Sequence, residues 1–237
     1  MAGHSKWHQI RHKKGANDKQ RGKVFTKHSR LITLAAKNGD DPDLNASLRS
    51  AIDNAKAENV PNDNIKRAIA KASLDAKNQI SMAEVLYEVY SVEGCAILIE
   101  ALTDNKNRTF TNVRNIMNKN DGSLGEQGSV SFMFEKKGYF EIKTSNENKD
   151  DLLLELMDTD PDSIEESNNS IVLTCKANDF AKFRDILNEK NLIIESAKLA
   201  FISNTKIEVS DEALEKISNL IDKLEEDDDV MDVYTNL

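Results

Sequence analysis

The sequence predicts an α+β fold with three domains, and three observations predict it. Between about Val24 and Ser73 the apolar residues recur with a helical period. Beyond Lys77, short β-like runs alternate with amphipathic helices, as in sheets covered by helices. The last predicted helix and strand have no neighbour in sequence against which to bury their apolar faces, so we expect them to join an earlier segment.

The first domain is predicted to span residues 1–77 and to hold a basic arm and a three-helix bundle. Pro42 and Pro61 separate three apolar series, at points where a helix can begin but hardly continue. Asn38-Gly39 is typical of a helix end, and Asn62 and Asp63 suit a first helical turn. The three series are Val24, His28, Leu31, Ile32 and Ala35; Leu44, Leu48, Ala51, Ile52 and Ala55; and Ile65, Ala68, Ile69 and Ala72.

The second domain is predicted to be discontinuous, formed by residues 78–129 and 205–237. Val85–Ser91 and Cys95–Leu102 are β-like runs around Glu93-Gly94, which indicates a hairpin. A helix over Arg108–Asn118 follows, and we expect Phe110, Val113 and Met117 on its inner face. The glycine-rich stretch 122–128 predicts an ordered loop or a crossing between domains. The amphipathic helix Asp211–Leu224 and the strand Val230–Asn236 would complete this domain.

Residues 130–204 are predicted to form a third domain, inserted into the second. Their elements follow the order β-α-β-β-α-β, which is the ferredoxin-like order. The predicted elements are strand Gly138–Lys143, helix Asn148–Met157, strands Ser163–Glu166 and Ser170–Cys175, helix Phe180–Asn188 and strand Ile193–Phe201.

Composition and motifs exclude several classes of protein. A 39% hydrophobic and 31% charged composition is typical of a globular protein. No apolar run approaches the ~20 residues of a bilayer span, and the N-terminus lacks the apolar core of a signal peptide. Cys95 and Cys175 are predicted to be buried small hydrophobes. The sequence holds no phosphate-binding loop, nucleophile elbow or metal-spaced Cys/His set, so we expect no enzyme, cofactor, metal or small-molecule substrate.

The distribution of charge is the most informative feature of the sequence. The net charge is −9, yet residues 1–38 hold ten Lys or Arg and one acid, a local charge of +9. The other 199 residues carry −18, with 22 Lys or Arg against 40 Asp or Glu. A concentrated cationic segment on an acidic chain predicts a polyanionic partner, because the local field dominates binding. The alternative is a solvated basic tail that aids solubility.

The cations of the basic arm, residues 1–27, and of the next helical turn are the candidate nucleic-acid ligands. Cations at this density neutralise phosphates and release counterions, and Trp7 among them can stack on an unpaired base. The part before Gly22 has too little apolar surface to fold alone, so we expect it to become ordered on its partner. The candidate residues are Lys6, Trp7, Arg11, His12, Lys13, Lys14, Lys19, Arg21, Lys23, Lys27 and Arg30.

Three histidines of the arm recur at helical spacing, at His4, His8 and His12. A metal site would need converging ligands, but Lys6, Arg11 and other cations oppose a further positive charge there. Hydrogen bonding to phosphates or bases is therefore the preferred interpretation.

A second candidate site lies in the segment Leu102–Thr109, which joins a strand to a helix start. Lys106, Asn107 and Arg108 would face an anion at the positive end of this helix. The alternative is that the amide and hydroxyl side chains of the segment only cap the helix. The two interpretations are compatible, and Arg114, Asn115 and Lys119 could extend the surface.

The acidic run Glu225–Asp229 is expected to be the solvated end of a helix. Two other roles are open: weak binding of a divalent cation, and docking of the basic arm when nucleic acid is absent.

Several of these motifs resemble the YebC/PmpR family. The segments Met1–Trp7, Arg21–Lys27 and Leu102–Thr109, together with Gly128-Ser129-Val130 and the terminal Asp232–Asn236, carry the resemblance, which runs from end to end of the chain. Three residues depart from the family pattern: His28 and Ser29, where apolar residues are common, and Phe110, where smaller residues often occur. None of the three lies in the basic arm.

The resemblance implies three domains around a cleft: a helical domain, an α+β domain and an inserted ferredoxin-like domain. It also implies a cytoplasmic, non-enzymatic protein of the kind long described as a probable DNA-binding transcriptional regulator. The same family includes the mitochondrial translational activator of cytochrome oxidase, and members are tied to translation and to relief of stalled ribosomes.

Three functions are therefore open. The first is a DNA-binding transcriptional regulator, although the bundle shows no evident helix-turn-helix recognition helix. The second is a translation factor bound to the ribosome through ribosomal RNA, which Trp7 and a basic arm suit slightly better. The third is a protein-interaction module built on the ferredoxin-like domain. The first is the leading prediction and the second its alternative.

Overall fold

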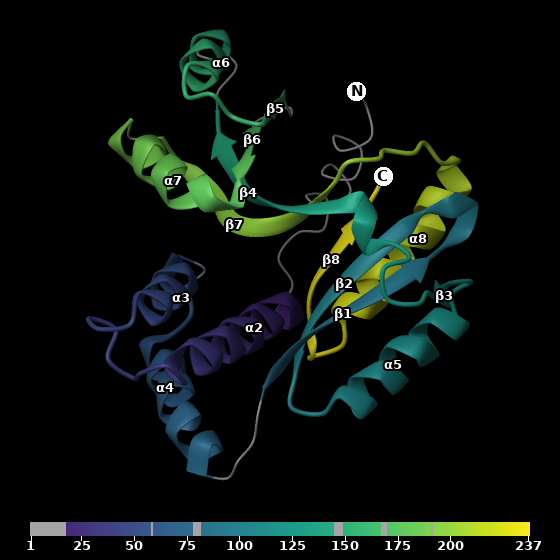
Figure 1. Ribbon diagram of the computed structural model, residues 1–237, viewed down its shortest axis with the longest axis horizontal. Helices are drawn as coiled ribbons and strands as arrows, with labels where there is room; N and C mark the ends of the chain where they lie inside the picture. Colours follow the sequence, from purple (N-terminus) through teal and green to yellow (C-terminus); the bar gives the residue numbers. More distant parts are fainter. Residues whose placement is uncertain (1–17, 58, 78–81, 145–148, 167–169, 191) are drawn as a thin grey trace.

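The computed structural model describes residues 18–57, 59–77, 82–144, 149–166, 170–190 and 192–237 (Figure 1). Its helices and strands form a helical group at the N-terminal end and two antiparallel four-stranded sheets. An α+β protein of three domains, one of them ferredoxin-like, is therefore confirmed. The predicted boundaries between the domains stay a prediction.

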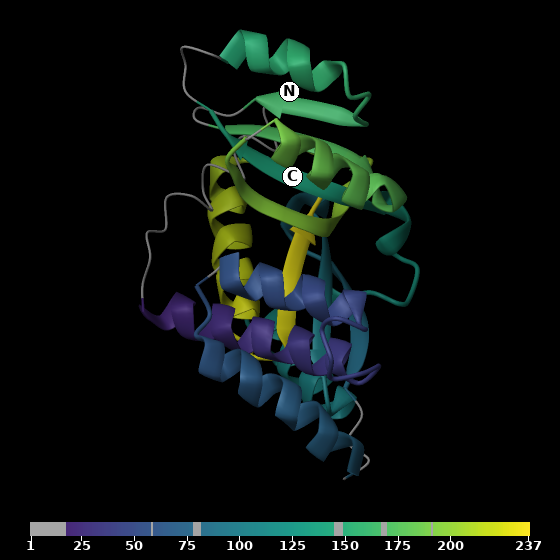
Figure 2. The same cartoon turned by 90° about the vertical axis from the view of Figure 1, so that its left-hand side faces the viewer.

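The N-terminal group consists of α2 (Asp18–Ala36), α3 (Ala46–Ala57) and α4 (Asn62–Lys77), which lie together in Figure 2. Apolar side chains from all three helices pack into one core, because each helix turns its apolar stripe inward. Asn45 caps α3, since its Oδ1 accepts from Leu48 N at 3.0 Å. Its amide also donates to the Ala35 carbonyl at 2.8 Å, which holds the end of α2 against the start of α3.

Two details of this group differ from the prediction. Residues 18–23 belong to helix α2, ahead of the apolar series that starts at Val24, because polar residues that carry no apolar period can still extend a helix. Leu44 lies before α3 and is 88% exposed, so it is not part of the second apolar face.

The first sheet has the order β3-β1-β2-β8. Its strands are β1 (Ala83–Tyr90), β2 (Ala96–Thr103), β3 (Ser123–Leu124) and β8 (Val230–Thr235). The predicted hairpin is present, with the 3₁₀ turn η1 (Val92–Gly94) between β1 and β2. Strand β8 joins this sheet as expected, and it pairs with β2. Helices α5 (Lys106–Asn118) and α8 (Asp211–Glu225) cover one face, where Val113, Ile217 and Ile221 are buried against the sheet.

The inner face of α5 differs from the prediction at one position. Val113 and Met117 are buried as expected, but Phe110 is 44% exposed and Thr109 is fully buried in its place. The reason is polar: the Thr109 hydroxyl donates to the buried carboxylate of Asp229 at 2.6 Å, a contact that a phenyl ring cannot make.

A buried carboxylate fixes the crossing from the first sheet to the second. Glu88 on β1 accepts hydrogen bonds from the backbone N–H groups of Gly128, Val130 and Ser131, at 2.5 to 2.7 Å. Burial opposes the charge of Glu88, yet these three donors outweigh it and lower the pKa of the carboxyl. The glycine-rich stretch is thus an ordered crossing, as predicted, and it contributes β3 to the sheet edge.

The second sheet has the order β5-β6-β4-β7, which is the ferredoxin-like arrangement. Its strands are β4 (Phe134–Lys143), β5 (Ser163–Glu166), β6 (Ser170–Lys176) and β7 (Ile194–Ser203). Helices α6 (Lys149–Met157) and α7 (Phe180–Glu189) pack on one face, and the 3₁₀ turns η2 (Ser131–Met133) and η3 (Ala177–Asp179) precede β4 and α7. Both cysteines are buried, as predicted.

The two sheets share a small apolar core. Leu98 and Tyr234 from the first sheet pack with Phe134 and Ala200 from the second. The rings of Tyr234 and Phe201 meet edge to face, with centroids 5.5 Å apart. Strands β7 and β8 therefore lie close together, which matters for the site described next (Figure 1).

Candidate nucleic-acid interface

The structure describes the predicted interface only in part. Six candidates of the basic arm, Lys6, Trp7, Arg11, His12, Lys13 and Lys14, lie outside the described residues, as do His4 and His8. The backbone of Lys19, Arg21 and Lys23 forms the first turns of α2. The side chains of Lys27, Arg30, Lys106, Asn107 and Arg108 are described, and three of these five make specific contacts with carboxylates.

Lys27 is held by the last strand of the chain. Its Nζ lies 2.5 Å from Asp232 Oδ2 and donates to the Met231 carbonyl at 2.8 Å. Lys198 on β7 approaches the other oxygen of Asp232 at 2.7 Å. Burial of Asp232 opposes its ionisation, but Lys198 and Lys27 outweigh this and hold the pKa of the carboxyl well below its usual range. Asp232 therefore joins α2, β8 and β7.

Arg30 and Arg108 meet on one buried carboxylate. Asp229 is 2% exposed; its Oδ1 lies 2.6 Å from Arg30 Nη1 and its Oδ2 lies 2.7 Å from Arg108 Nη2. The hydroxyls of Thr103 and Thr109 also donate to it, at 3.2 and 2.6 Å. We call these five residues the Asp229 cluster. Burial raises the pKa of Asp229, but the Thr109 hydroxyl and the two guanidinium groups lower it to about 2.

The start of α5 combines both roles that the sequence allows. Asn105 caps the helix, because its Oδ1 accepts from Arg108 N at 3.1 Å. Thr103 accepts from Asn105 N at 2.9 Å, which shapes the turn. Lys106 and Asn107 are exposed in the first helical turn, whereas the guanidinium group of Arg108 is turned to the carboxylates of Asp104 and Asp229.

The structure brings the two predicted sites together. Arg30 on α2 and Arg108 on α5 bind the same carboxylate, although 78 positions separate them in sequence. The acidic run supplies this link, so Asp229 is not a solvated helix end as the sequence predicts. The run could be identified as a helix end by pattern, but only the fold shows that its last residue is turned inward. The sequence does not predict the roles of Asp232 and Lys198 for the same reason, because only the fold brings their side chains together.

A groove lies between α2 and α4, beside the Asp229 cluster. It has a volume of about 550 Å³ and includes Gly22, Phe25, Arg30, Arg67 and Lys71 in its lining. Thr33 and Ala68 are buried at its base, where the Thr33 hydroxyl lies 3.0 Å from the Ala68 carbonyl and joins the two helices. We call it the α2–α4 groove.

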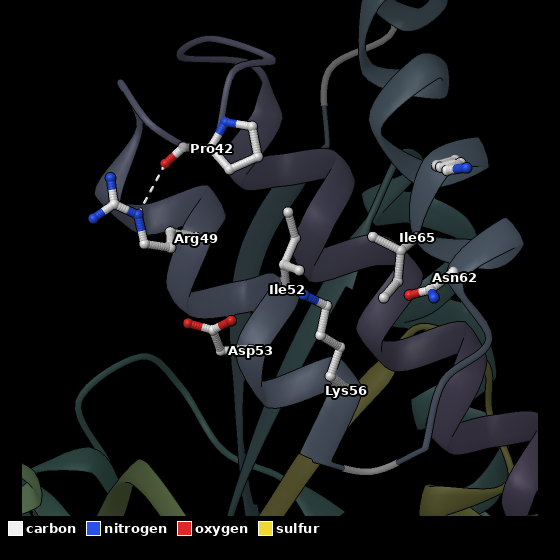
Figure 3. Close-up of a pocket in the computed structure, with 8 residues that line it drawn as sticks. Pro42, Arg49, Ile52, Asp53, Lys56, Asn62 and Ile65 are labelled. Atoms are coloured by element: carbon white, nitrogen blue, oxygen red, sulfur yellow. Dashed lines mark hydrogen bonds between the residues drawn. The ribbon is translucent and has the colours of Figure 1, made fainter.

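A smaller groove of about 300 Å³ lies between α3 and α4 (Figure 3). Its lining carries Arg49, Lys56 and Lys66 with one acid, Asp53. Arg49 is turned toward the α2–α3 connection, where its Nε donates to the Pro42 carbonyl at 3.1 Å (Figure 3). The lining of this groove therefore includes a carboxylate, whereas that of the α2–α4 groove includes none.

Within the described ranges, no three His, Cys, Asp or Glu side chains converge on a point where a metal ion would fit. None of the helices in that same part of the chain has the length and apolar character needed to cross a bilayer.

Comparison with known proteins gives close relatives over the whole chain. A probable transcriptional regulatory protein of Listeria innocua is 44% identical, and the alignment covers 100% of this chain and 98% of that relative. The Bacillus subtilis probable transcriptional regulatory protein YrbC is 43% identical, with 100% and 99% covered. A probable transcriptional regulatory protein of Finegoldia magna is 41% identical, with 100% and 98% covered.

A solved structure has the same fold. The crystal structure of the conserved hypothetical protein Aq1575 from Aquifex aeolicus superposes with a TM-score of 0.84 at 33% sequence identity. The match covers 92% of this chain and 90% of that one.

Two family models together span nearly all of the sequence. Residues 5–75 match the TACO1/YebC protein N-terminal domain. Residues 82–237 match the TACO1/YebC second and third domain. The chain therefore belongs to the TACO1/YebC family.

Proposed function

We propose that this chain is a non-enzymatic regulator of gene expression that binds nucleic acid through its basic N-terminal arm, as a DNA-binding transcriptional regulator in the cytoplasm. The observation that carries the proposal is the charge distribution: +9 in residues 1–38 against −18 in the other 199. A repulsive acidic body and an attractive arm direct a phosphate polymer to the N-terminal segment of the chain. The names of the relatives, each a probable transcriptional regulatory protein, support the same proposal.

The contacts of the described side chains divide the candidates into two groups. Lys27, Arg30 and Arg108 already face carboxylates, so we assign them mainly to positioning α2 and the start of α5. Lys106 and Asn107 are exposed and are proposed as a second contact with phosphates. The arm residues Lys6, Trp7, Arg11, His12, Lys13, Lys14, Lys19, Arg21 and Lys23 are the proposed principal ligands.

A ribosome-associated translation factor is the second candidate, in which the arm binds ribosomal RNA. Trp7, the single tryptophan of the chain, favours it, because an indole among cations can stack on an unpaired base. Both candidates use the same phosphate chemistry and differ in the nucleic acid that is bound.

Removal of residues 1–17 tests the proposal. We expect the truncated protein to keep its fold, measured by circular dichroism, and to lose most of its affinity for both duplex DNA and ribosomal RNA in a salt titration, because six of the principal ligands are removed. Unchanged affinity after truncation would contradict the proposal. The ratio of the full chain's affinities for duplex DNA and ribosomal RNA, measured at one salt concentration, separates the two candidates.

A further inference from the structure

We propose that the α2–α4 groove binds one unpaired segment of a single-stranded nucleic acid, with a phosphate at its cationic rim and a base against its apolar wall. This inference rests on the proposed function and adds a second binding site to the arm. It concerns the shared chemistry of single-stranded RNA and single-stranded DNA.

The charge of the groove is the first argument. Its lining includes the cations Arg30, Arg67 and Lys71 and no Asp or Glu, in a chain whose net charge is −9. An anionic ligand is therefore favoured over a cationic or neutral one.

The pairing of these cations is the second argument. Arg30 has the carboxylate of Asp229 as its partner. Arg67 is instead oriented by neutral acceptors, the Asp63 carbonyl at 3.2 Å and Asn64 Oδ1 at 2.5 Å. No carboxylate of a described residue forms an ion pair with Arg67 or Lys71, and both are exposed. Their charges are available to a phosphate, and the guanidinium group of Arg67 is already held in place.

The shape of the groove is the third argument. Its volume of about 550 Å³ lies within the range of small-ligand sites. Phe25 and Met82 are half-buried in its lining and offer apolar surface, while Thr26, Ser29 and Asn64 offer polar groups. An unpaired base can stack on such a surface, whereas the bases of a duplex are already stacked and paired. A single strand is therefore the better fit.

The position of the groove is the fourth argument. Gly22 lies in its lining and stands between the arm cations Arg21 and Lys23 in sequence. The groove is therefore joined directly to the arm along the chain, and one strand can contact both.

The test is a salt titration of the full chain carrying Arg67→Gln and Lys71→Gln, with fluorescein-labelled oligouridine as the probe. We expect affinity to fall on the order of tenfold and the slope of log K against log salt to fall by about 1.4. Lys71→Gln alone, at an exposed side chain, should give about half of the change in slope. Oligothymidine and a hairpin duplex are the other probes. Equal losses of affinity for oligouridine and oligothymidine assign the groove to both single-stranded RNA and single-stranded DNA. A loss for only one of these two assigns the groove to that nucleic acid.

Two control variants make the result specific. Lys182→Gln with Arg184→Gln removes the same two charges from α7, outside the groove, and should change binding little. Arg67→Lys with Lys71→Arg keeps both charges and should therefore retain the slope of log K against log salt. Normal single-strand binding by the groove variant, or an equal loss in the α7 variant, would overturn the inference.

Quenching of Trp7 fluorescence separates this inference from the proposed function. If the groove variant binds normally while the probe still quenches Trp7, the groove inference fails and the arm proposal stands. If the unaltered full chain binds none of the three probes at low salt, the proposed function itself fails.

Discussion

Asp229 shows how one buried carboxylate can orient the cations around it. A carboxylate removed from water is costly unless its oxygens are satisfied, and here two guanidinium groups and two hydroxyls supply the donors. The arrangement also orients Arg30 and Arg108. Their positions in the candidate interface therefore depend on a residue that would not itself touch an anion.

Replacement of Asp229 by Asn should lower the free energy of unfolding by about 2–4 kcal/mol at neutral pH, because two arginines lose their shared carboxylate. Urea unfolding measures this change. Asp228→Asn is the matched control, since Asp228 is exposed and adjacent, and it should be close to neutral. Equal effects of the two substitutions would show that Asp229 makes no special contribution.

The stability difference between the unaltered protein and Asp229→Asn should depend on pH with a defined sign. Folding lowers the pKa of Asp229 from 3.8 to about 2, so its stabilisation is fully present above about pH 4 and is lost as the pH falls through about 2. The stability difference between the unaltered protein and Asp229→Asn should therefore shrink over that window. A constant difference would contradict the assignment.

At the scale of elements, the crossing at residues 122–131 depends on Glu88 more than on its own residues. Its three backbone donors would otherwise be unsatisfied near the junction of the sheets. The crossing is thus held to β1 by the Glu88 side chain, while the crossing itself is rich in glycine.

Glu88→Gln should cost about 1–3 kcal/mol of stability, because an amide has one acceptor oxygen where the carboxylate has two. Hydrogen exchange should speed up at the amides of Gly128, Val130 and Ser131. Glu84→Gln on the same strand is exposed and serves as the control. Unchanged protection of the three amides would show that Glu88 does not hold the crossing.

The elements themselves are largely predictable from the sequence. The helices and strands of the inserted unit follow local periodicity, and β5 lies at Ser163–Glu166 as predicted. Phe110 and Leu44 are exposed against expectation, because periodicity records the spacing of apolar residues and not the polar contacts or chain turns that decide which side faces inward. The return of β8 to the sheet of β1 and β2 follows from an argument about unpartnered faces, although that argument does not identify β2 as its partner.

The candidate site is less predictable than the fold. A charge count locates the arm, and helix-start signals locate Lys106 and Arg108. The carboxylates that face Lys27, Arg30 and Arg108 come from segments more than 100 residues away, except for Asp104. Such tertiary contacts leave no local signal in the sequence.

At the scale of the whole molecule, Asp232 joins three parts of the chain. It lies on β8 of the first sheet and binds Lys27 from α2 and Lys198 from β7 of the second sheet. The apolar core between the sheets lies beside it, at Tyr234 and Phe201. The arrangement of the helical group and the two sheets therefore depends in part on one carboxylate.

Asp232→Asn should loosen both of its contacts at once, because each lysine loses its charged partner. We expect faster hydrogen exchange in both α2 and β7, with a loss of about 3 kcal/mol of stability. Asp158→Asn, at an exposed position after α6, is the control. Exchange that changes only within β8 would contradict this role.

Asp229 and Asp232, the partners of Arg30 and Lys27, both lie near residue 230, and this has a consequence for biosynthesis. Of the described elements, β8 leaves the ribosome last, and at ~5–20 residues per second it follows α2 by roughly ten seconds or more. During that interval the nascent α2 has its lysine and arginine but neither of their aspartates. Newly made α2 thus carries Lys27 and Arg30 without these two carboxylates until β8 has been synthesised.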